Sequence, residues 1–150
     1  LRARFLGPYL ADLPTPCARW NPLFRSLEPG LRDTAGLKLI DRPASEGFVA
    51  SSFQFLLLDW TPASLQDVIS RCRARGVELK WFGGAEPSGF TSRYDSWRYA
   101  ASDRMPKSDR ILAGIIDMRL PRTFSTDDCT QIARIIRAQV GAVWQNQADE

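Results

Sequence analysis

The most regular alternation of apolar and polar positions lies between Thr61 and Gly76. Its apolar residues recur at the spacing of one face of a helix, at Leu65, Val68, Ile69 and Cys72. Thr61 suits the N-cap, Pro62 suits the first helical position, and Gly76 suits the end of the helix. The pattern therefore predicts a helix with a single apolar face.

A second helix is predicted from Ser125 to about Trp144. It opens with a serine and two acids, which favour the positive end of the helix dipole. The apolar positions that follow share one side of the helix: Cys129, Ile132, Ala133, Ile136, Val140 and Val143.

Three apolar stretches predict strands, at residues 48–58, 77–82 and 111–118, and a short edge strand is expected at 37–40. A right-handed crossover leaves the first two strands parallel, and the third fits between them in the opposite direction. The expected fold class is α+β, with a small three- to four-stranded, mainly antiparallel sheet (a split βαβ arrangement). Its strand order is 1-3-2, and its helices pack on one face.

The first third of the chain is less regular. Residues 17–32 predict either one kinked helix or two helical pieces, and Pro29-Gly30 weakens the end of this region. Residues 1–14 place apolar side chains at helical spacing with no partner in the predicted sheet and helices: Phe5, Leu6, Tyr9, Leu10 and Leu13. We expect two parts, a segment at 1–14 that docks on another domain and a small domain at 15–150.

Composition limits the chemistry. At 150 residues and 44% apolar content the chain can bury one core, and a net charge of +3 with no block of like charge suggests an ordinary solvated surface. Histidine is absent, so zinc sites and histidine-dependent triads are not expected. The cysteines Cys17, Cys72 and Cys129 suggest free thiols in a reducing compartment. With no membrane span or signal sequence evident, we expect a cytoplasmic protein, and a start at Leu1 suggests a piece of a longer one.

Residues 80–99 form an aromatic, glycine-containing segment that predicts a functional loop. Its aromatic residues either cover the sheet and fill a domain interface or line a substrate mouth: Trp81, Phe82, Phe90, Tyr94, Trp97 and Tyr99. Arg93 in this loop and Arg119 at the end of a strand are candidates for binding a carboxylate or phosphate. No catalytic and no metal-binding residue is predicted. Asp117 is interpreted as a turn or cap residue, and Ser52 as structural.

The order of these signals resembles the C-terminal small domain of the pyridoxal-phosphate (PLP)-dependent fold-type-I aminotransferases, specifically the DegT/StrS sugar-aminotransferase group. The resemblance covers residues 17–143. It rests on FVASSFQF at 48–55, GVELKWF at 76–82, MPKSD at 105–109 leading to a strand, MRLP at 118–121 and IARII at 132–136.

The resemblance implies a PLP-binding N-terminal domain that carries the cofactor lysine, and it implies a homodimer. In such a protein this chain would shape the substrate side of the cleft and bind no cofactor alone. Lys38, Lys80 and Lys107 do not match the cofactor lysine of the family: Lys80 alternates outward on a strand and Lys107 lies in a loop. The parent protein would be an aminotransferase, and the chain alone is expected to be inactive.

Two other functions remain open. One is a free-standing regulatory domain that binds a small molecule or a peptide across the aromatic loop without catalysis. The other is binding of single-stranded nucleic acid through stacking aromatic and arginine side chains. The resemblance favours neither, and we expect no nucleic acid and no membrane among the partners.

Overall fold

The computed structural model describes residues 2–43, 45–84, 86, 99 and 103–148. Its elements follow in the order α1 (Arg2–Ala11), α2 (Pro14–Leu31), β1 (Lys38–Leu39), β2 (Ser52–Leu56), α3 (Pro62–Ala74), β3 (Lys80–Trp81), α4 (Pro106–Gly114), β4 (Ile115–Arg119) and α5 (Thr126–Ala148). This is the predicted α+β class.

The sheet has the order β1-β2-β4-β3, and every neighbouring pair is antiparallel. Strands β2 and β3 are therefore parallel to each other with β4 between them, as the 1-3-2 order predicted. The edge strand β1 is also confirmed. The hydrogen-bonded strands are shorter than the predicted ranges.

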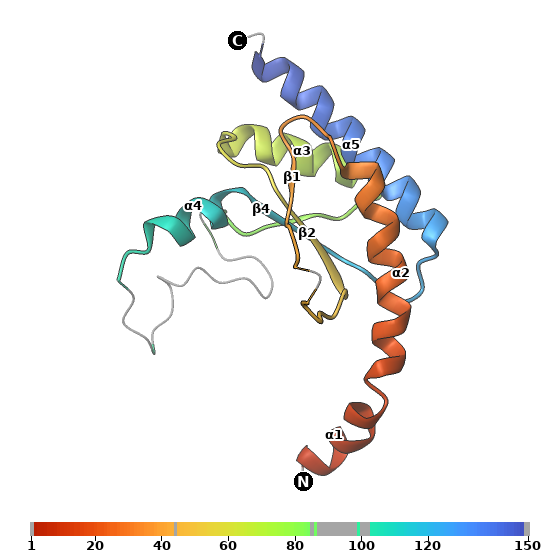
Figure 1. Ribbon diagram of the computed structural model, residues 1–150. Helices are drawn as coiled ribbons and strands as arrows, with labels where there is room; N and C mark the ends of the chain where they lie inside the picture. Colours follow the sequence, from red (N-terminus) through yellow and green to blue (C-terminus); the bar gives the residue numbers. More distant parts are fainter. Residues whose placement is uncertain (1, 44, 85, 87–98, 100–102, 149–150) are drawn as a thin grey trace.

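Helices α2, α3 and α5 pack on one face of the sheet (Figure 1). The core forms where alternate strand residues meet these helices. Its largest fully buried side chains come from both layers: Phe53, Phe55, Ile116, Leu27, Leu31, Leu65, Val68, Ile136 and Val140. The helices of the sheet-covering layer thus lie on one face, as predicted.

The caps of α3 follow the sequence signals. The Thr61 side chain accepts a hydrogen bond from the Ser64 amide at 3.1 Å, and Pro62 occupies the first turn. Gly76 adopts φ +81°, the left-handed conformation that ends a helix at little cost to glycine. Helix α5 continues beyond the predicted end at Trp144 to Ala148.

The prediction for residues 111–118 is wrong in its first half. Residues 111–114 belong to α4, and only the later residues form β4. A short apolar run does not distinguish a strand from a helix. The signal that decides is Pro106 at the start of α4, a position that proline favours. Lys107 consequently lies on this helix and not in the predicted loop.

Residues 14–31 form one helix, α2, although Pro22 and Pro29 lie inside it. Pro29-Gly30 does not end the helix because tertiary packing holds it. A Cβ atom built on Gly30 would lie 2.8 Å from the Ala133 Cβ, so this glycine lets α2 approach α5 closely. The absent side chain is therefore a packing requirement.

We expect Gly30→Val to lower the free energy of unfolding by about 2 kcal/mol, because the added atoms overpack the contact with Ala133. Gly141→Ala in α5 is the control: a Cβ there meets nothing within 4 Å, and alanine favours the helix by about 1 kcal/mol. Urea denaturation measures both variants. Equal midpoints for Gly30→Val and the wild type would contradict the close-packing argument.

Candidate functional site

The face of the sheet opposite the core carries a set of polar residues. On β2 and β4 the side chains alternate between buried core positions and half-buried or exposed positions. The register places Gln54 opposite Asp117, and Asp117 opposite Lys80, so one residue from each of three strands forms a row. Arg119 lies opposite Ser52 in the next row of the same face. We call this surface, made of Ser52, Gln54, Lys80, Asp117 and Arg119, the open face.

A hydrogen-bonded network connects three residues of the open face. The Gln54 side-chain amide (Nε2) donates to Asp117 Oδ1 at 3.1 Å and to Ser52 Oγ at 3.2 Å. Asp117 lies in the middle of β4, so its interpretation as a turn or cap residue is wrong. The alternation of Ser52 and Gln54 within a predicted strand was the available signal, but it did not identify their partner across the sheet.

Arg119 is the last residue of β4, close to the predicted strand end, and its side chain is exposed. Lys80 is half-buried on β3, on the outward side that the alternation predicted. The sequence therefore predicted which face of the sheet Lys80 occupies, although not its position in a row with Gln54 and Asp117.

Trp81 points to the core side of the sheet and packs partly against the core. Its indole N–H donates to the Ala113 carbonyl at 2.8 Å, near the end of α4. Gly83 allows this contact, since a Cβ there would lie 2.7 Å from both Ala113 Cα and Trp81 Nε1. The indole N–H thus links β3 to α4.

The next aromatic residue, Phe82, is half-buried, and its backbone amide donates to the Ile115 carbonyl at 3.4 Å. The predicted residues Phe90, Arg93, Tyr94 and Trp97 lie outside the described residues. Of the predicted substrate-contacting residues, the open face contains Arg119, and Trp81 lies on the other side of the sheet.

Solved structures share this arrangement of elements. The aminotransferase TlmJ from Streptoalloteichus hindustanus superposes with a TM-score of 0.71 and 17% identity, over 90% of this chain and 34% of that chain. DesI, crystallised with its TDP-sugar product, gives 0.67 and 15% over 93% and 35%. A DegT DnrJ EryC1 StrS aminotransferase from Brucella abortus gives 0.63 and 15% over 86% and 32%.

This chain has the fold of the C-terminal domain of DegT/StrS aminotransferases. The resemblance found in the sequence is confirmed at the level of fold. The chain spans about a third of the length of the solved structures it matches. No family model matches the sequence. No curated protein matches it either.

Residues that could hold a metal ion do not gather in the part of this DegT/StrS-like lobe that the structure describes. None of the helices in that part combines the length and hydrophobicity needed to cross a bilayer. The three cysteines are free; Cys72 and Cys129 are buried, as their positions on apolar helix faces predicted, and Cys17 is half-buried. Burial raises the pKa of the Cys72 thiol to about 11, which disfavours the nucleophilic thiolate.

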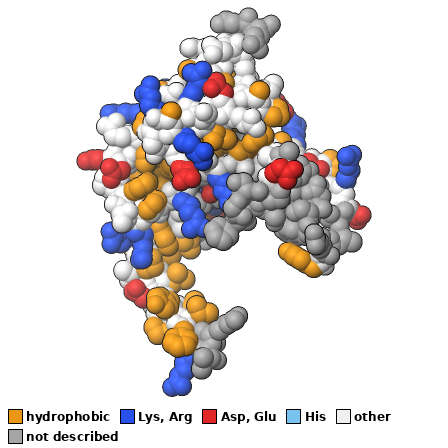
Figure 2. All heavy atoms as spheres, turned by 180° about the vertical axis from the view of Figure 1, so that it is seen from behind, with side chains coloured by type: hydrophobic (Ala, Val, Ile, Leu, Met, Phe, Trp, Pro, Cys, Tyr) orange, Lys and Arg blue, Asp and Glu red, His pale blue; other side chains and the backbone are white. Residues whose placement is uncertain are grey.

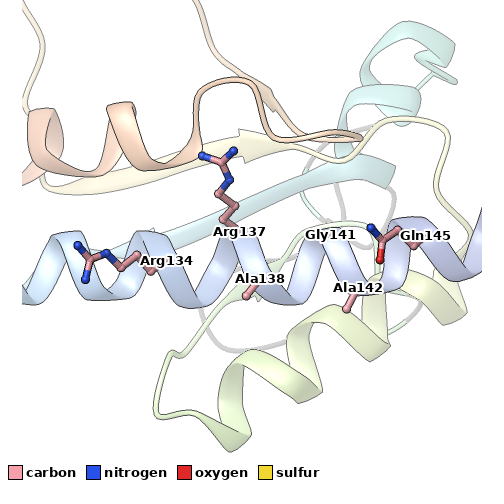
Figure 3. A pocket seen from close by; sticks show the side chains of 6 residues that line it. All are labelled: Arg134, Arg137, Ala138, Gly141, Ala142 and Gln145. Atoms are coloured by element: carbon pink, nitrogen blue, oxygen red, sulfur yellow. The ribbon is translucent and has the colours of Figure 1, made fainter.

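A shallow depression of about 470 Å³ lies on the outer side of α5 (Figure 3). It is lined by one helix: Arg134, Arg137, Ala138, Gly141, Ala142 and Gln145. Since α5 covers the core side of the sheet, the depression is separated from the open face by the body of the lobe. Ligand sites usually converge from several elements, so the open face is the better candidate.

We expect the stability of the chain to fall as pH rises from about 9 toward 11. The folded state binds the Cys72 proton more tightly than the unfolded state, whose thiol has the ordinary pKa of 9.0. The contribution is therefore present below pH 9 and is lost as pH rises through the folded pKa, with a slope of up to about 1.4 kcal/mol per pH unit. Urea denaturation across this range measures it. The same slope in Cys72→Ala would show that another group is responsible.

Proposed function

We propose that this chain is the C-terminal lobe of a PLP-dependent sugar aminotransferase and forms the substrate side of its cleft. The observation that carries the proposal is the extent of the structural match, which covers 90% of this chain but 34% of TlmJ. A lobe that corresponds to a third of an enzyme fold supplies part of a cleft. In this proposal the remaining polypeptide supplies the other part.

The exposed apolar side chains of helix α1 support the proposal that another domain packs against it. Its apolar side chains are exposed: Phe5 70%, Leu6 56%, Tyr9 76% and Leu10 65%. Figure 2 shows hydrophobic side chains gathered over α1, where it projects from the body of the lobe. Fully burying each such side chain is worth about 1.5–3 kcal/mol. We therefore propose that residues 1–14 dock on an N-terminal PLP-binding domain.

The described lysines do not suit the covalent attachment of PLP. Lys38 is exposed on the edge strand, and Lys107 is exposed in the first turn of α4. Lys80 lies opposite a carboxylate on the open face. A nucleophilic lysine needs a lowered pKa, which comes from burial in an apolar pocket or from a neighbouring cationic group. PLP supplies the electron sink for transamination, and we propose that a lysine outside this chain binds it.

Within the proposed enzyme, Arg119 and Phe82 would approach the substrate, and Trp81 would support that region from the core side. Phe90, Arg93, Tyr94 and Trp97 remain proposed substrate contacts from the sequence alone. A homodimer and a cytoplasmic location also remain predictions. The alternative of a free-standing ligand-binding domain is less well supported, because it leaves the apolar face of α1 without a partner.

We expect the purified chain to form no lysine-linked chromophore with PLP and to carry out no half-transamination with an amino donor. The measurement is the absorption spectrum with PLP before and after borohydride reduction, with free lysine and a known PLP enzyme as controls. A reducible chromophore on the chain would contradict the proposal that the cofactor lysine lies elsewhere.

We expect the double substitution Leu6→Glu and Leu10→Glu to change the unfolding free energy of the chain by less than about 0.5 kcal/mol, because both side chains are exposed. Leu27→Ala is the control for a packed helix, since Leu27 is fully buried and should lose about 2–5 kcal/mol. A similar loss in the α1 variant would mean that α1 packs on this lobe and is not free to dock elsewhere.

A further inference from the structure

We draw no further inference here: the strongest candidate, the shallow depression over Arg134, Arg137 and the small residues on the outer face of α5, is lined by residues of that one helix, and nothing in the part of the chain that the structure describes shows what covers it.

Discussion

The close crossing of α2 and α5 is the constraint on which the rest of this structure depends. Gly30 presents no side chain to Ala133, so the two helices approach closely enough to share one core. Leu27 and Leu31 from α2 and Ile136 and Val140 from α5 are fully buried as a result. Among the residues that the structure describes, the helices that pack on the sheet all lie on this one side of it.

Two features of the described surface fit the proposal that this chain is part of a larger protein. The exposed apolar face of α1 gains from burial against a partner, and the polar network of the open face gains from a ligand or a neighbouring domain. The hydrogen bond from Trp20 to the Leu120 carbonyl links α2, which follows α1 after a short turn, to the residue directly after β4.

The sequence was most informative where local chemistry determines structure. Thr61 and Pro62 specify the start of α3. The Thr61 side chain accepts a hydrogen bond from a helix N–H group, and Pro62 has no N–H group that would need a partner. Neither signal depends on a tertiary contact. The strand order followed from connection rules that hold for most sheets. The free, buried state of Cys72 followed from its position on an apolar helix face.

The errors occur where long-range contacts decide. Pro29-Gly30 is a helix-ending signal alone, but contact with Ala133 keeps it helical. The run at 111–118 divides into the end of α4 and the strand β4, and β4 is fixed by its pairing with β2 and β3, which are distant in sequence. The partnership of Gln54 and Asp117 depends on a register between strands 63 positions apart, which no local pattern contains.

The central claim is that the reactive groups lie in polypeptide beyond these 150 residues. The most direct measurement is peptide mapping by mass spectrometry after incubation with PLP and borohydride reduction of the proposed longer polypeptide that would contain this chain. The account predicts that the phosphopyridoxyl group is found on a lysine outside residues 1–150. Its recovery on Lys38, Lys80 or Lys107 would contradict the account.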